Sequence, residues 1–246
     1  MKFWNFIKNA ATETEPESVE LHISGDIVDD EDAWLYEWFG IEHASPNAFK
    51  EELNGFSGHD LTVWIDSYGG SVFAAAGMYN ALMEHKGKVT VKIDTKAMSA
   101  ATIIAMAGDE ILMAPGAVMM IHNPLTEVYG YASDLRKTAD VLDEIKESIM
   151  NAYQMKTGRS RAKLAAMMDD ETYMSAKTAM KEGFATGMLY ADAEAKPIEM
   201  TFNRHEMIGT TVDAVKRMVA LFTPDKDPPP DNTQEKEKLL LQIDLI

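Results

Sequence analysis

The chain has 246 residues, of which 46% are hydrophobic and 26% are charged, and this composition predicts one sizeable packed domain with appendages. It has no cysteine, so disulfides, thiolate metal sites and a cysteine nucleophile are excluded. The formal net charge of −17 argues against a nucleic-acid partner, because a phosphate backbone would be repelled. No apolar run suits a signal peptide or a membrane helix, so we expect a cytoplasmic protein without a membrane partner.

Strands and helices are predicted to alternate in the first half of the chain, after an N-terminal arm at 1–18. Alternating or continuous apolar runs predict three strands, at 19–28, 61–67 and 88–94. The second of these is mostly apolar, so we expect it to be buried on both faces. Three helices are predicted around them, over 46–54, over 71–85 and from Ser99 onwards. This alternation favours an α/β fold built on a largely parallel sheet.

The second half is predicted to be mainly helical. Two short apolar segments within 110–121 precede a long amphipathic helix at 132–157. One stripe of that helix is apolar, namely Leu135, Ala139, Leu142, Ile145, Ile149 and Tyr153. Shorter helices are predicted near 160–168 and 175–182. The domain is expected to end near residue 195, followed by an extension at 196–222 and a proline-rich acidic linker with an apolar tail at 223–246.

Three segments together suggest an acyl-transfer site, which needs an activated hydroxyl and N–H groups that face the oxyanion. Gly69 and Gly70 follow a predicted strand, where glycine permits a positive φ, although a plain tight turn explains them equally well. Ser99 begins a predicted helix, where serine is usually a cap. His122 ends an apolar segment, where a structural role is more common. Each feature is weak alone, and the hypothesis depends on their combination.

That combination resembles the Clp protease proteolytic subunit, and more closely its phage relatives that act as head maturation (prohead) proteases. The matching segments are DSYGGSVFAAAGMYNAL, KAMSAATIIAMAGDEILMAPGAVMMIHNP, YGYASDLRKTADVLDEIKESIMNAYQMKTG and ETYMSAKTAMKEGFA. Their order fits, as do the separations of 29 residues from Gly70 to Ser99 and 23 residues from Ser99 to His122. The resemblance spans residues 19–190. It implies an α/β fold of the ClpP/crotonase type, a spiral of β-β-α units with a projecting handle helix.

The resemblance also implies a serine endopeptidase that needs no metal or cofactor. Ser99 takes the nucleophile position and His122 that of the general base, while the backbone N–H groups of Gly70 and Ala100 form the oxyanion hole. The third triad member falls on Glu171, where the Clp subunit usually has aspartate, and a shift to Asp170 is left open. Tyr68 replaces the proline of the housekeeping subunit, and its N-terminal docking loops for an unfoldase are not recognisable here.

Partners also follow from the resemblance. The handle helix at 132–157 would interlock a ring of identical subunits, although its apolar stripe could instead pack on its own domain. The expected substrates are capsid or scaffold proteins, in the host cytoplasm or within the procapsid. The alternatives are a housekeeping, unfoldase-dependent Clp peptidase, an acyl-CoA enzyme of the crotonase family, and a non-catalytic assembly protein.

Overall fold

The computed structural model describes residues 4–9, 18–30, 43–44 and 46–191. The predicted extension at 196–222 and the linker and tail at 223–246 lie outside these residues. Within the described part of the chain, no helix is long and apolar enough to cross a membrane.

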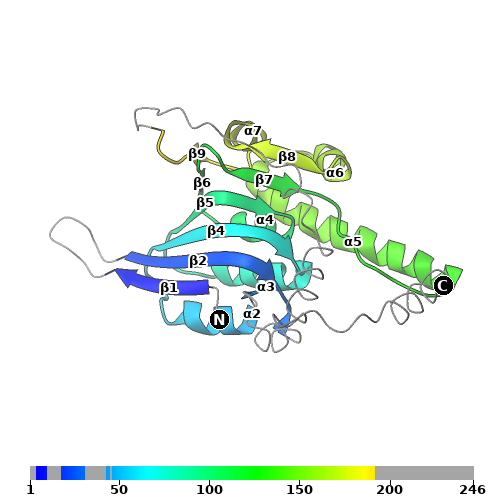
Figure 1. Cartoon of the computed structure of the whole chain (residues 1–246), viewed down its shortest axis with the longest axis horizontal. Helices are drawn as coiled ribbons and strands as arrows, with labels where there is room; N and C mark the ends of the chain where they lie inside the picture. Colours follow the sequence, from blue (N-terminus) through cyan, green and yellow to red (C-terminus); the bar gives the residue numbers. More distant parts are fainter. Residues whose placement is uncertain (1–3, 10–17, 31–42, 45, 192–246) are drawn as a thin grey trace, which may run out of the picture. The chain divides into compact units, whose positions relative to one another are not determined.

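The described strands form one nine-stranded sheet (Figure 1). Its main path runs in the order β1-β2-β4-β5-β6-β9, with β3 beside β2, and β7 between β5 and β8. The strands of the main path are β1 (Trp4–Asn9), β2 (Ser18–Ile27), β4 (Leu61–Gly70), β5 (Val89–Met98), β6 (Glu110–Met113) and β9 (Gly187–Met188). The three others are β3 (His43–Ala44), β7 (Val118–Ile121) and β8 (Thr172–Ser175). From β2 to β9 the path is parallel, as the sequence predicts.

Six helices are described in residues 46–191. They are α2 (Pro46–Asn54), α3 (Val72–Met83), α4 (Ala100–Ala105), α5 (Ala132–Thr157), α6 (Arg161–Asp169) and α7 (Ala176–Glu182). Serine hydroxyls cap α3, α6 and α7 by accepting a backbone N–H of the first turn. Gly158 and Gly183 end α5 and α7 in the left-handed conformation, for which glycine has no steric cost. All six helices coincide closely with predicted ones.

The sheet contributes one fully buried face to the core. In β4 the side chains of Leu61, Val63 and Ile65 are buried, while Thr62 and Trp64 between them are only partly covered. The prediction that this strand is buried on both faces was therefore wrong. Its alternation is that of a strand with one face against helices, and the polar Thr62 is the residue that indicates it.

The edges of the sheet hold strands that the sequence patterns did not predict. Residues 4–9, expected within an arm, form β1 antiparallel to β2, and Phe6 stacks on Phe56 at 4.9 Å between ring centroids. The division of the chain at residue 18 stays a prediction. β8 pairs antiparallel with β7, and β9 adds two residues beside β6. β8 and β9 have only four and two residues, so their pairing is decided by neighbouring strands rather than by their own composition.

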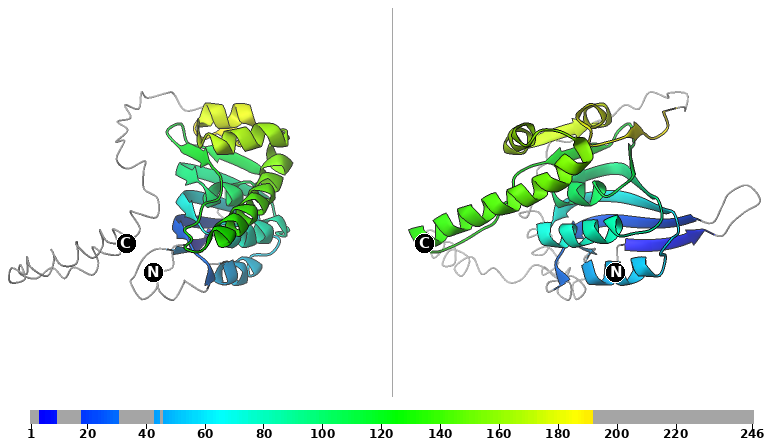
Figure 2. Two further views of the ribbon diagram at one scale, coloured as in Figure 1. Left: turned by 90° about the vertical axis from the view of Figure 1, so that its right-hand side faces the viewer. Right: turned by 180° about the vertical axis from the view of Figure 1, so that it is seen from behind.

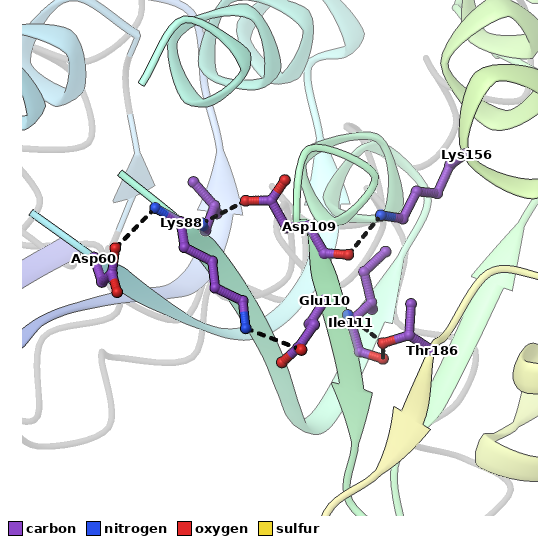
Figure 3. Close-up of polar contacts among 8 residues, drawn as sticks. Asp60, Lys88, Asp109, Glu110, Ile111, Lys156 and Thr186 are labelled. Atoms are coloured by element: carbon purple, nitrogen blue, oxygen red, sulfur yellow. Dashed lines mark hydrogen bonds and ion pairs between the residues drawn. The ribbon is translucent and has the colours of Figure 1, made fainter. Parts of the chain in front are cut away.

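Polar contacts hold together the starts of β5 and β6 (Figure 3). The Lys88 N–H donates to Asp60, and the Val89 N–H donates to the carboxylate of Asp109 at 2.8 Å. The Lys156 ammonium on α5 donates to the backbone carbonyl of Asp109, which attaches the C-terminal part of that helix to the sheet. The strands are thus fixed at their amino ends, which leaves their carboxyl ends available for a site.

The handle helix α5 differs along its length. Ile149, Met150 and Tyr153 near its C-terminus are buried in the core, whereas Leu135 and Val141 in its N-terminal part are exposed. Figure 2 shows this N-terminal part extending beyond the sheet. Of the two interpretations of its apolar stripe, packing on its own domain therefore holds only for the C-terminal part.

Candidate active site

Ser99 occupies a sharp turn between β5 and α4. Its backbone has φ 53° and ψ −125°, a conformation that a residue with a side chain rarely adopts. The Ser99 N–H donates to the Met120 carbonyl at 2.9 Å, which holds the turn against β7. Unlike the serines that begin α3, α6 and α7, Ser99 makes no side-chain cap hydrogen bond. Ser99 therefore does not play the ordinary capping role of a serine at a helix start. Its strained backbone conformation, with a positive φ, is typical of functional sites.

His122 reaches Ser99 because β5 changes its partner along its length. The first half of β5 pairs with β6, and its last three residues pair with β7, with Met98 opposite Met120. Two residues beyond Met120, the Nε2 atom of His122 lies 2.6 Å from the Ser99 Oγ atom. This distance is that of a good hydrogen bond between the two side chains.

The environment of His122 favours the neutral form of its ring. The side chain is only 11% exposed. Burial lowers the pKa of His122 from its ordinary value, and the nearby Glu171 carboxylate partly opposes that effect. A neutral imidazole that accepts a hydrogen bond from a hydroxyl can take the hydroxyl proton, which is the task of a general base.

Glu171 lies on the other side of the His122 ring. The antiparallel pairing of β7 with β8 puts Ile121 opposite Thr172, so the residues that flank this pair also come together. The Glu171 Oε1 atom is 3.8 Å from the His122 Nδ1 atom, within range of an ion pair but longer than a hydrogen bond. Glu171 also has a positive φ of 46°, and its side chain is 63% exposed. Asp170, the alternative acid, ends α6 as its C-cap residue.

Asp169 forms a second set of contacts beside the candidate triad that sequence reasoning missed. Its Oδ1 atom accepts from the Lys146 ammonium of α5 at 2.5 Å and from the Asn123 side-chain amide at 2.9 Å. Hydrogen bonds from these two donors lower the pKa of Asp169 from its ordinary value, and Lys146 has the larger effect. Asn123 directly follows His122, which was an available signal, but nothing in the sequence connects Lys146 to residue 169.

Gly69 and Gly70 pack tightly against two different parts of the backbone. A Cβ at Gly69 would lie 2.7 Å from the Met98 carbonyl oxygen and 2.8 Å from the Ser99 Cβ. A Cβ at Gly70 would lie 2.1 Å from the Ile27 carbonyl oxygen on β2. Their φ values, 109° and 141°, also favour glycine. Gly69 therefore lets the end of β4 approach the turn that carries Ser99, and Gly70 lets it approach β2.

Ala100 is the first residue of α4, and the first N–H groups of a helix have no partner within the helix. A Cβ at Gly69 would be 3.0 Å from the Ala100 nitrogen, so this amide lies beside the glycine pair. Among the residues that the structure describes, no group of three or more His, Asp or Glu side chains is arranged to hold a metal ion.

A serine hydroxyl hydrogen-bonded to a histidine, with a carboxylate near the other ring nitrogen, is the arrangement of side chains found in serine hydrolases, where it occurs on several unrelated folds. The family model for Clp protease matches residues 54–191, more than half of the sequence. The chain belongs to the Clp protease family.

Individual relatives are similar over the same part of the chain. An ATP-dependent Clp protease proteolytic subunit from Bacteroides fragilis is 29% identical over 134 residues, covering 54% of this chain and 65% of that protein. The subunit of the same description from Bacteroides thetaiotaomicron is 28% identical over 134 residues, covering 54% and 61%. The chain thus spans less than two thirds of the length of these curated relatives.

Among solved structures, a ClpP1 mutant from Listeria monocytogenes matches with a TM-score of 0.56 at 20% identity. The match covers 69% of this chain and 90% of that one. This likeness confirms the predicted ClpP-type α/β fold.

Proposed function

We propose that the chain is a serine endopeptidase in which Ser99 is the nucleophile and His122 the general base. The observation that carries this proposal is the 2.6 Å contact between the Ser99 hydroxyl and the His122 imidazole, made by a serine that caps nothing. Membership of the Clp protease family supports the same chemistry.

The reaction would follow the usual course of acyl transfer. The Ser99 Oγ attacks the peptide carbonyl carbon, and its proton passes to the His122 Nε2. The carbonyl oxygen, now negative, faces the N–H groups of Ala100 and Gly70. His122 then gives its proton to the departing amine, which leaves an acyl-enzyme on Ser99. Water attacks that ester by the same route and releases the second product.

The carboxylate of Glu171 would orient the imidazole and stabilise the imidazolium that forms. A glutamate can close the 3.8 Å separation from the His122 Nδ1 by rotating its side chain, because that chain is largely exposed and has three flexible dihedral angles. Asp170 remains the alternative acid.

Association of identical subunits through α5 is part of this proposal. Large apolar side chains are exposed on this helix and on the segment that leads into it, namely Leu125, Val128, Tyr129, Tyr131, Leu135 and Val141. Burying them in a ring of subunits would be favourable, and a ring would enclose the serines in a chamber. A cytoplasmic location and capsid or scaffold substrates rest on the sequence resemblance, and the relatives named above are Clp proteolytic subunits.

The test is intact-mass analysis of the full chain after treatment with a fluorophosphonate. We expect one adduct on the wild type and none on Ser99→Ala or His122→Ala. The matched control is Ser175→Ala, which removes a serine that does cap a helix and should leave labelling unchanged. A wild type that stays unlabelled at every subunit concentration overturns the proposal.

Two further assays distinguish the substrate classes. Cleavage of a co-expressed capsid precursor at defined bonds, lost in Ser99→Ala, would support the phage role. Degradation of fluorescein-labelled casein only in the presence of an unfoldase would support a housekeeping Clp peptidase instead.

A further inference from the structure

Two buried hydroxyl groups connect the handle helix to the backbone of the nucleophile. The Thr102 Oγ1 atom lies 2.5 Å from the Tyr153 hydroxyl oxygen, and it also donates to the Ser99 carbonyl oxygen at 2.5 Å. Thr102 is completely buried on α4, and Tyr153 is almost completely buried on α5. Because Thr102 uses its proton for Ser99, Tyr153 must donate its own proton to Thr102. The result is a chain of two hydrogen bonds that ends on the Ser99 carbonyl.

The carbonyl at the end of this chain shares a peptide unit with the Ala100 N–H. A peptide unit is planar, and in its trans form the C=O and the N–H point in opposite directions. The Ser99 carbonyl also accepts the Thr102 N–H at 3.0 Å. Two bonds therefore fix the direction of the C=O, and by planarity they also fix the direction of the N–H on the other side.

We propose that Thr102 and Tyr153 are positioning residues that aim the Ala100 N–H at the oxyanion. This inference rests on the proposed function, because it assigns the Ala100 amide a role in the reaction. Hydrogen bonds in a chain also polarise one another, so donation to the Ser99 carbonyl makes the Ala100 N–H a stronger donor. Donors in an oxyanion hole are effective only when held at the right place before the reaction begins.

The surroundings of Tyr153 keep this chain in one arrangement. Its ring meets Phe184 edge to face, with centroids 5.3 Å apart, so the phenol cannot rotate away freely. Burial raises the pKa of Tyr153 far above its ordinary value, so the hydroxyl keeps its proton at any working pH. Because Tyr153 belongs to α5, hydrogen bonds connect the handle helix to the peptide unit that would hold the oxyanion.

The experiment measures the rate constant of inactivation and the binding constant of the fluorophosphonate on the full chain. Thr102→Val removes the hydroxyl at nearly constant volume, and we expect the rate constant to fall about ten-fold. Tyr153→Phe keeps the ring against Phe184 and should lower it about three-fold. The binding constant should stay the same, because the amide acts on the transition state. Thr102→Ser, which keeps the hydroxyl, should restore the rate constant to about half of the wild-type value or more.

The double variant separates positioning from stability. Thr102→Val alone leaves the buried Tyr153 hydroxyl without its hydrogen-bond partner Thr102 and should lower the melting temperature. Removing both hydroxyls takes away the stranded group, so the melting temperature should recover. The rate constant should stay as low as in Thr102→Val. A rate constant that recovers together with the melting temperature would mean that the pair is only structural, and would overturn the inference.

The control is a tyrosine hydroxyl far from this chain of hydrogen bonds in the sequence. Tyr79→Phe removes a partly buried phenol hydroxyl on α3 that packs against the core, and it should change neither constant. The apparent pKa of labelling should be the same in all these variants, because the chain of hydrogen bonds ends on the carbonyl of Ser99 and not on His122. If the wild type is labelled but Thr102→Val is labelled equally fast, only the inference fails. If the wild type is not labelled, the proposed function and the inference fail together.

Discussion

Ser99 and Glu171 lie on opposite sides of His122 and are held by different kinds of structure. The N–H, carbonyl and hydroxyl of Ser99 all make hydrogen bonds, and its neighbours on β5 and α4 are buried. Glu171 lies in the short connection between α6 and β8, with a positive φ and a largely exposed side chain. Its carboxylate is 3.8 Å from the ring, whereas the Ser99 hydroxyl is at 2.6 Å.

This difference shows which half of the site depends on the fold. Ser99 is placed by strand register and core packing, so it cannot move without disturbing the sheet. The carboxylate is placed by a side chain in contact with water, where a charge interaction is strongly screened. We therefore expect changes near Ser99 to have large effects and changes on the acid side to have graded ones.

Among variants that keep both Ser99 and His122, the largest effect is expected for Gly69→Ala. The new Cβ would press on the Met98 carbonyl and the Ser99 Cβ, neither of which can move independently of β5. We expect fluorophosphonate labelling to fall at least about 100-fold, since a displacement of roughly 1 Å at a reacting group has that order of effect. The measurement is the labelling rate, together with the melting temperature to show that the variant is folded.

Gly58→Ala is the matched control for Gly69→Ala. Gly58 also has a positive φ, 87°, but no atom lies within 4 Å of the position of its Cβ. This substitution adds backbone strain of about 1–2 kcal/mol without a clash, so the melting temperature should fall while labelling stays normal. Equal loss of labelling in both variants would show that the close contact with Ser99 does not matter.

A smaller effect is expected for Glu171→Gln, which keeps the shape of the side chain and removes its charge. The labelling rate should fall about 10- to 100-fold, less than the ~10⁴-fold that a buried triad aspartate contributes. The corresponding variant Asp170→Asn should change the rate little. The opposite ranking of these two variants would identify Asp170 as the acid.

The pH dependence of the Glu171→Gln variant sharpens the same comparison. Labelling needs neutral His122, and burial lowers the pKa of that ring, so the wild-type rate should rise with pH with its midpoint below the ordinary histidine pKa of about 6.5. The Glu171 carboxylate raises the pKa of His122. Removing its charge should therefore shift the midpoint to lower pH even as the plateau falls. A midpoint that moves upward would contradict this assignment of charges.

Sequence reasoning brought together Ser99 and His122, which the structure places in contact, and it missed pairs that depend on contacts between distant helices. Ser99 and His122 were predicted from the motifs around them, and the register of β5 with β7 explains why those motifs meet. The Thr102–Tyr153 pair joins residues 51 positions apart. Neither residue attracts attention on its own helix, and a single sequence contains no signal that two residues this far apart are in contact. The strand β1 was missed because the apolar patch in residues 4–9 is short, and such a patch does not by itself indicate pairing with β2.

The smallest effect is expected at Lys146, which contacts Asp169 close to Glu171. Lys146→Met removes one of the two donors to Asp169. The Asp169 carboxylate, which accepts a hydrogen bond from the Asn123 amide next to His122, is then held in place less firmly. Because the Asp169 side chain is largely exposed, we expect the labelling rate to fall only about two- to five-fold. The matched control is Glu147→Gln, which removes the charge of a similarly exposed carboxylate from an ion pair with Arg161 between the same two helices. If both variants slow labelling equally, attachment of α6 to α5 matters and the contact with Asn123 does not. If only Lys146→Met does so, the handle helix influences the Glu171 side of the site through a single charge, whereas its contact with the Ser99 backbone runs through the buried Thr102–Tyr153 pair.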